Sequence, residues 1–333
     1  MSAWIVFILC ATGIVLAGIR LAPYGDALGK RLGIGQAWVG LIFLATLTSI
    51  PELTTTVTGA SIGAPNIALG NAFGSNLFNV AIIGVMDILL MRRRPGSFLA
   101  QVQPYHTISG GMAILLTAVA MLGMLWKPQV TLFGISPISF LILIGYCIGV
   151  FLLFQAEREA PDQEAPRATR VSLPGAVSGF VICGAIIVVS GIFLVHASKE
   201  IALSTGLSAT FMGAILVAIV TSLPELATSI GALRIGAQDM IVGNLFGSNM
   251  FNILTIFFAD MAFRKGSIYS ALGAGEGDQL LVAGCGIILT GIAVVSIGAR
   301  SRRRVFGVGV DSILLLGVYA AVTAVIIGRG IQL

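Results

Sequence analysis

Long apolar segments, separated by short polar connections, run through the whole chain. A transmembrane α-helix needs about 20 consecutive apolar residues at a rise of about 1.5 Å each, and the segments reach that length. They cover residues 3–23, 36–60, 66–91, 106–126, 132–154, 173–196, 207–232, 238–263, 279–299 and 309–328. The pattern predicts an all-α integral membrane protein with about ten transmembrane helices.

Composition supports this prediction and adds an orientation. Hydrophobic residues make up 57% of the chain and charged residues only 10%, against roughly a quarter charged in soluble domains. Lys and Arg gather in alternate connections, as at 92–94 and 302–304, and such connections usually face the cytoplasm. We therefore expect a multi-pass protein of the cell membrane with both termini on the non-cytoplasmic side. The topology accounts for the basic charge, so no nucleic-acid partner is expected.

Two polar motifs each occur twice in the chain. Residues 48–52 read TSIPE and residues 221–225 read TSLPE, while 70–79 read GNAFGSNLFN and 243–252 read GNLFGSNMFN. The same interval, equal to that from Glu52 to Glu225, separates the two copies of both motifs, and we call it the repeat interval. The polar residues are the best preserved between the copies, which a duplication kept only for folding would not require.

The duplication predicts two halves of opposite orientation. Residues 1–154 and 173–333 each hold five apolar segments, and a polar stretch at 155–172 forms the expected cytoplasmic linker. An odd number of spans makes the second half enter the membrane from the other side, and such inverted repeats place a transport site near the midplane. The fold is therefore predicted as two inverted five-helix repeats.

Two glutamates lie deep inside apolar segments. Glu52 and Glu225 each follow a proline, and a carboxylate at that depth is costly and is retained mainly to handle ions or protons. Pro51 and Pro224 have no N–H for the carbonyl four residues earlier, so each helix should kink just before the glutamate. Carboxylate, hydroxyl and backbone carbonyl oxygens suit hard cations such as Ca²⁺ or Na⁺.

The spacing of nearby polar residues favours the same site. Thr48 and Ser49 precede Glu52 by four and three residues, which places them on one helix face. Asn71, Ser75 and Asn79 form a stripe on the next segment, repeated by Asn244, Ser248 and Asn252. Helix packing through small polar residues is the alternative interpretation. Glycines beside the stripes, and Asn76 and Asn249 away from them, are expected to serve packing and structure.

The two motif pairs resemble the alpha-repeats of the calcium/cation antiporter superfamily, in its sodium/calcium exchanger family. The resemblance covers residues 45–84 and 218–257, and the ten-span layout extends it along the chain. It implies that Glu52 and Glu225 are central metal ligands. The further implied positions are Thr48, Ser49, Ser75, Asn79, Thr221, Ser222, Ser248 and Asn252, and the backbone carbonyls of Ala45 and Ala218.

One position departs from the family pattern. Well-known sodium/calcium exchangers carry Asp where this chain has Asn252, so its site holds two carboxylates and a matched pair of asparagines, Asn79 and Asn252. Two ionised glutamates balance one Ca²⁺ or two monovalent ions. The identity and number of the counter-ions therefore stay open at this point, with H⁺ and K⁺ as alternatives to Na⁺.

The expected function is secondary active antiport of Ca²⁺ against Na⁺ by alternating access, without a cofactor beyond the transported ions. A passive cation channel would use the same ligands but would show flux without counter-transport. An intramembrane enzyme is disfavoured, because the chain has no HExxH motif and no histidine placed to activate a serine. Expected partners are Ca²⁺, monovalent cations and the lipid bilayer.

A few other residues carry separate expectations. His106 and His196 fall near segment ends and are predicted to be interfacial. Asp87 and Asp260, also one repeat interval apart, are predicted to anchor the structure by pairing with basic residues. The four cysteines are scattered singly and are predicted to be small core residues.

Overall fold

The computed structural model describes residues 3–90, 97–129, 131–159, 171–205, 217–273, 276–300 and 303–330. Helices form almost all of it. The long helices are α1 (Ala3–Leu32), α5 (Pro65–Leu90), α6 (His106–Trp126), α7 (Pro137–Glu159), α8 (Leu173–Thr205), α12 (Gln238–Ala262), α13 (Glu276–Ala299) and α14 (Val310–Gly330).

Shorter helical pieces make up the remaining spans. The first bent span consists of α2 (Gln36–Trp38), the π-helical η1 (Val39–Leu44), α3 (Ala45–Thr48) and α4 (Ile50–Ser61). The second contains α10 (Ala218–Thr221) and α11 (Leu223–Arg234). The connections hold the 3₁₀ turns η2 (Leu99–Gln101) and η4 (Ile268–Ala271) and an antiparallel pair of short strands, β1 (Arg304–Val305) and β2 (Val308–Gly309).

The membrane character predicted from the sequence is confirmed. In the described residues, eight helices are long and apolar enough to cross a bilayer, and the bent pair Gln36–Thr48 and Ile50–Ser61 passes the same test together. The first part of the expected span 207–232 lies outside the described residues, and α10 and α11 form the rest. Helix α7 continues through Glu159, into the segment expected as linker.

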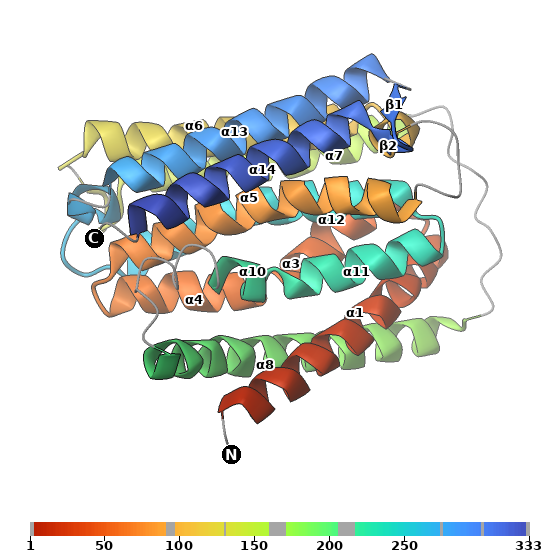
Figure 1. Cartoon of the computed structure of the whole chain (residues 1–333), viewed down its shortest axis with the longest axis horizontal. Helices are drawn as coiled ribbons and strands as arrows, with labels where there is room; N and C mark the ends of the chain where they lie inside the picture. The colour runs from red at the N-terminus through yellow and green to blue at the C-terminus, as the bar shows by residue number, and fades with distance from the viewer. Residues whose placement is uncertain are drawn as a thin grey trace.

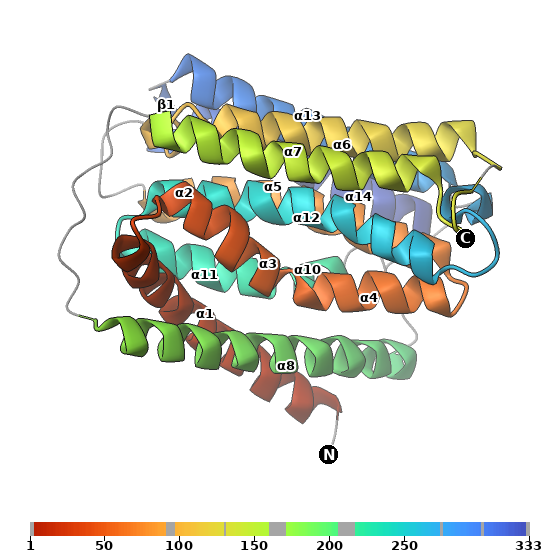
Figure 2. The ribbon, with the colours of Figure 1, turned by 180° about the vertical axis from the view of Figure 1, so that it is seen from behind.

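The helices of the two halves correspond in order. Helices α1, α4, α5, α6 and α7 match α8, α11, α12, α13 and α14, consistent with the predicted inverted repeat. Figures 1 and 2 show α1 and α8 together along one side and α6, α7, α13 and α14 along the other, with α4, α5, α11 and α12 between. The motif-bearing helices therefore form the centre of the bundle.

Both bent spans break at the serine before the Pro-Glu pair. Ser49 (φ −90°, ψ 10°) and Ser222 (φ −87°, ψ 9°) leave helical geometry, and the two parts of the first span meet at 46°. The proline two residues after each serine lacks the N–H needed to continue the helix and is tolerated at the start of the next one. The predicted kink is present in the first span, and the second span breaks at the equivalent serine.

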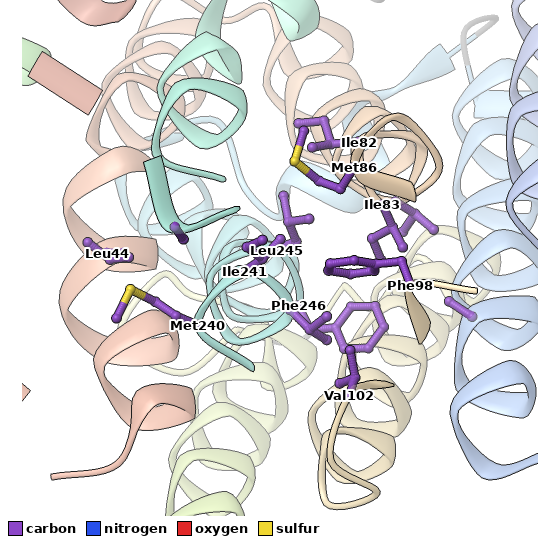
Figure 3. Close-up of a cluster of buried hydrophobic side chains, with 14 of the residues drawn as sticks. Leu44, Ile82, Ile83, Met86, Phe98, Val102, Met240, Ile241, Leu245 and Phe246 are labelled. Atoms are coloured by element: carbon purple, nitrogen blue, oxygen red, sulfur yellow. The ribbon is translucent and has the colours of Figure 1, made fainter. Parts of the chain in front are cut away.

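Apolar side chains fill the space around the central helices. Figure 3 shows one such cluster, where Leu245 and Phe246 of α12 lie among side chains of α5 and of the segment after it, including Met86 and Phe98. Leu44 at the end of η1 belongs to the same cluster. This packing fixes the first bent span against the helices that carry the polar stripes.

Two local predictions are wrong. Cys147 is exposed rather than a small core residue. His106 is completely buried at the start of α6 rather than interfacial, and its Nε2 lies 3.3 Å from Asp239 Oδ1. The hydropathy pattern placed it correctly at a helix end, but it gave no information that the preceding segment and α12 cover this end.

Candidate functional site

Glu52 and Glu225 occupy equivalent places in the two halves, in the first turn of the helix that follows each break. Both are fully buried, with exposed fractions of 0%. A buried charge is costly unless opposite charge or hydrogen bonds compensate it. The groups around these two carboxylates therefore determine what they do.

Serine hydroxyls from each half contact the glutamate of the other half. Ser49 Oγ donates to Glu225 Oε1 at 2.9 Å, and Ser222 Oγ donates to Glu52 Oε1 at 3.1 Å. Ser248 Oγ also donates to Glu225 Oε1, at 3.1 Å. The two bent spans thus meet at their breaks, and one site is formed from both halves.

The threonines before each break extend this polar region. Thr221 Oγ1 lies 3.3 Å from Ser75 Oγ and 3.4 Å from Asn71 Oδ1, and Thr48 Oγ1 lies 3.5 Å from Asn244 Oδ1. All five side chains are buried. The structure therefore brings the predicted threonines against the predicted stripes.

The carbonyl oxygens of Ala45 and Ala218 lie one turn before the breaks. They accept the N–H of Ser49 at 3.0 Å and of Ser222 at 3.1 Å. The hydroxyls of Thr48 and Thr221 approach the same two oxygens at 3.4 and 3.2 Å. A carbonyl oxygen has two lone pairs, so each can keep its helical bond and offer the second lone pair once its threonine turns away.

Four asparagines cross-link α5 and α12. Asn76 Nδ2 donates to the Asn249 carbonyl at 3.1 Å, and Asn249 Nδ2 donates to the Asn76 carbonyl at 3.2 Å. Asn79 Nδ2 and Asn252 Nδ2 then donate to the side-chain oxygens of Asn249 and Asn76, both at 3.1 Å. Asn76 and Asn249 therefore hold the halves together, as predicted for residues off the stripe.

Four buried acceptor oxygens in this region have no hydrogen-bond donor among the described residues. They are Glu52 Oε2, Glu225 Oε2, Asn79 Oδ1 and Asn252 Oδ1. They form two equivalent pairs, because Glu52 corresponds to Glu225 and Asn79 to Asn252. Buried acceptors are normally paired, and oxygens without a donor are what a cation requires of its ligands.

Glycines allow the helices that carry these groups to approach closely. A Cβ added at Gly243 would lie 2.6 Å from the Ala37 carbonyl oxygen, and one at Gly247 would lie 2.8 Å from Leu41 Cα. Backbone cannot give way cheaply at such distances. The predicted packing role is confirmed for these two glycines, which seat α12 against the first bent span.

Two buried threonines near the site were missed by sequence reasoning. Asn71 Nδ2 donates to the Glu52 carbonyl at 3.2 Å and lies 3.0 Å from Thr56 Oγ1. Asn244 Nδ2 lies 3.1 Å from Thr228 Oγ1. These bonds hold each stripe against the helix that carries the glutamate. Threonine on a membrane helix is too common for the sequence to single these out.

The described residues contain no group of three His, Cys, Asp or Glu side chains placed to hold a metal ion. The candidate site therefore differs from the carboxylate- and histidine-rich centres of metalloenzymes. Its oxygens come from two carboxylates together with hydroxyls, amides and backbone. Such a set suits ions that must bind and leave, since a ligand set with little negative charge binds cations less tightly.

A family model for the sodium/calcium exchanger protein matches residues 2–156 and 175–328, which is nearly the whole chain. The chain belongs to this family. Proteins of the sodium/calcium exchanger family are membrane transporters and not enzymes. Membership therefore indicates that the general activity of this chain is the exchange of Ca²⁺ and other cations. The two matched ranges coincide with the two halves of the fold.

Individual relatives agree with this family. The chain is 28% identical to the putative antiporter CaxA of Alkalimonas amylolytica over 90% of this chain and 94% of the relative. It is 24% identical to the sodium/calcium exchanger MaX1 of Methanosarcina acetivorans over 69% and 74%. The fold is similar to that of the sodium-calcium exchanger NCX_Mj, with a TM-score of 0.72, 20% identity and coverage of 97% and 99%.

Proposed function

We propose that the protein is a secondary active antiporter that exchanges Ca²⁺ for Na⁺ at one midplane site centred on Glu52 and Glu225. The observation that carries the proposal is the set of four acceptor oxygens, on Glu52, Asn79, Glu225 and Asn252, that have no donor among the described residues. They are buried and contributed equally by both halves. A packing role for these side chains would favour donors for their oxygens, because buried acceptors are normally paired.

The hydrogen bonds around the glutamates support ion binding in a particular way. In each carboxylate the Oε1 atom accepts serine hydroxyls, while the Oε2 atom accepts none from the described part of the chain. The serines hold the carboxylate orientation, and the second oxygen is left for the cation. Two carboxylates balance one Ca²⁺ or two Na⁺, so ions of one kind must leave before ions of the other kind bind.

The breaks at Ser49 and Ser222 support alternating access. Each bent span can change its angle at a residue that is already outside helical geometry, and hinges use such positions. Because Ser49 contacts Glu225 and Ser222 contacts Glu52, movement of either span changes the ligands of both. Ligand exchange is thereby linked to the conformational change that opens one face or the other.

The ion coupling is tested with ⁴⁵Ca²⁺ uptake into proteoliposomes that contain the purified protein. Separate samples carry an outward Na⁺, H⁺ or K⁺ gradient. We expect uptake driven by Na⁺. Uptake driven only by H⁺ or K⁺ would show that this ion, and not Na⁺, is the coupling ion. Ca²⁺ flux that depends on no counter-ion gradient would indicate a channel.

The site is tested by Glu52→Gln and Glu225→Gln. Each removes one of two ligand charges, and we expect gradient-driven Ca²⁺ uptake to fall at least roughly 100-fold, since losing a charged ligand costs several kcal/mol. Glu159→Gln, at an exposed glutamate of α7, is the control with the same chemical change. Folding of each variant is verified by gel filtration. Near-normal uptake by either site variant would show that transport does not require both glutamates.

A further inference from the structure

Glu157 makes a contact that the ion site does not explain. It lies near the end of α7, only 6% exposed, and its carboxylate accepts two backbone N–H groups of α2. Ala37 N donates to Oε1 at 2.9 Å, and Trp38 N donates to Oε2 at 3.1 Å. A buried carboxylate placed on backbone donors in this manner fixes the position of the segment that provides them.

The segment it holds leads directly to the candidate site. The helical run Gln36–Thr48 begins at these N–H groups and ends at the break, after Ala45 and Thr48. The first N–H groups of a helix have no partner within the helix, and a carboxylate there also interacts favourably with the helix dipole. Glu157 therefore determines where the first half of the bent span starts.

Neighbouring groups reinforce the contact. A Cβ added at Gly35 would lie 2.8 Å from Glu157 Oε2, so glycine leaves room for the carboxylate. The rings of Trp38 and Phe154 pack edge-to-face with centroids 5.3 Å apart. Gln36 Nε2 donates to Asp26 Oδ1 at 3.2 Å, which ties the same turn to α1. Helix α2 is thus clamped between α1 and α7.

The sequence has no carboxylate at the equivalent position of the second half. The position one repeat interval after Glu157 is Gly330, and glycine carries no side-chain oxygen. Glu157 also lies at the end of the bundle predicted to face the cytoplasm. The glutamate of this clamp is therefore not repeated at the equivalent position of the second half.

We propose that Glu157 is a positioning residue for ion exchange, which holds the first bent span in the present arrangement, where Glu157 and His106 at the predicted cytoplasmic end are buried. Release of this contact frees the start of the span and favours the state that is open on that side. The inference rests on the proposed exchange function, because the span matters for transport only if Ala45, Thr48 and Ser49 bind ions.

Two substitutions break the contact from opposite sides. Glu157→Gln keeps the size of the side chain and removes its charge. Gly35→Ala leaves Glu157 unchanged and displaces its carboxylate, and the φ of −70° at Gly35 is accessible to alanine. The matched controls are Glu159→Gln on the same helix and Gly111→Ala, where an added Cβ meets nothing within 4 Å.

Hydrogen exchange measures the contact independently of transport. Amide exchange in the peptide that covers residues 33–48 should become faster in Glu157→Gln and Gly35→Ala, because the N–H groups at the helix start lose their acceptor. Exchange in the controls should equal that of the wild type. Unchanged exchange in both test variants would overturn the clamp itself.

Transport measured from both faces tests the positioning role. The apparent KM for Ca²⁺ is measured in membrane vesicles of each orientation. It should fall roughly three- to tenfold at the face nearest Glu157 and rise at the other face, because two charge-assisted hydrogen bonds no longer stabilise one of the two conformations. Merely impaired folding would lower the maximal rate equally at both faces. That equal loss, or an unchanged ratio of the two KM values, would overturn the proposal.

The wild-type protein in the same vesicles separates the two proposals. If it shows no gradient-driven Ca²⁺ exchange, the proposed function fails, while the hydrogen-exchange result still reports whether Glu157 holds the span. If the wild type exchanges normally and the test variants match their controls, only the positioning role fails.

Discussion

At the scale of the residue, the amide of Asn252 has a fixed orientation. Its Nδ2 donates to Asn76 Oδ1, and Asn76 cannot simply turn over because its own Nδ2 donates to the Asn249 carbonyl. The Oδ1 atom of Asn252 is consequently the one presented without a donor from the described residues. Asparagine at this position is therefore part of a bonded network, as well as a neutral substitute for aspartate.

Asn252→Asp should destabilise the ion-free protein. The new carboxylate would place an acceptor against Asn76 Oδ1, with a cost of about 1–3 kcal/mol. Bound Ca²⁺ should recover this loss, because the added charge is a better ligand. Thermal unfolding with and without Ca²⁺ checks both statements, and Asn79→Asp, opposite Asn249 Oδ1, should behave in the same way. An ion-free midpoint equal to the wild type would contradict this account.

At the scale of the element, the last helix of each half docks on the other half. The carboxylate of Asp260 in α12 accepts hydrogen bonds from two groups at the start of α7. These are Ser136 N at 2.7 Å and Ser139 Oγ at 2.8 Å. Asp87 of α5 accepts Gly309 N at 2.7 Å, just before α14, and lies 3.6 Å from an Arg304 nitrogen. The anchoring predicted for both aspartates is present, although Asp260 uses hydroxyl and backbone donors.

Asp260→Asn should lower stability without changing ion preference. The amide keeps one acceptor oxygen but turns an N–H group toward donors that include Ile268 N, which now donates at 2.8 Å. We expect a loss of roughly 2–3 kcal/mol in unfolding free energy. The unfolding midpoint and the Ca²⁺ to Na⁺ preference are measured together, with exposed Glu200→Gln as the control. A changed preference with an unchanged midpoint would instead place Asp260 in the transport path.

At the scale of the whole molecule, the two ends of the bundle use different chemistry at equivalent positions. His106 lies 3.3 Å from the Asp239 carboxylate near one end. The equivalents, one repeat interval away, are Gln279 and Asn66, where Gln279 Nε2 donates to the Asn66 carbonyl at 3.1 Å. A titratable pair at one end thus corresponds to a neutral amide contact at the other. Together with Glu157, it makes the predicted cytoplasmic end the more charged of the two.

His106→Gln introduces the residue found at the equivalent position of the second half, Gln279, and should be tolerated. The glutamine amide can donate to the Asp239 carboxylate, which lies 3.3 Å from the ring nitrogen, so we expect the unfolding free energy to change by less than about 1 kcal/mol and ion exchange to continue. His106→Leu has similar bulk without a donor and should be the less stable variant. The opposite order of the two unfolding midpoints would show that the hydrogen-bond donor is not what this position requires.

The sequence by itself determined the helical membrane architecture, the inverted repeat and the breaks at Ser49 and Ser222. These features depend on local causes: apolar length, the missing N–H of proline and the repetition of motifs in the chain. It also selected the residues that surround Glu52 and Glu225, because polar groups at that depth are rare enough to stand out.

Only the tertiary structure decided which atoms meet. The crossed serine bonds, the donor-free oxygens of Asn79 and Asn252, the burial of His106 and the contact of Glu157 with α2 join residues far apart in sequence. Such contacts depend on how helices pack, and helix packing is set by the shape of many side chains together. A pattern of polar and apolar positions shows which face of a helix is buried. Only the packed structure shows which residues of other helices that face contacts.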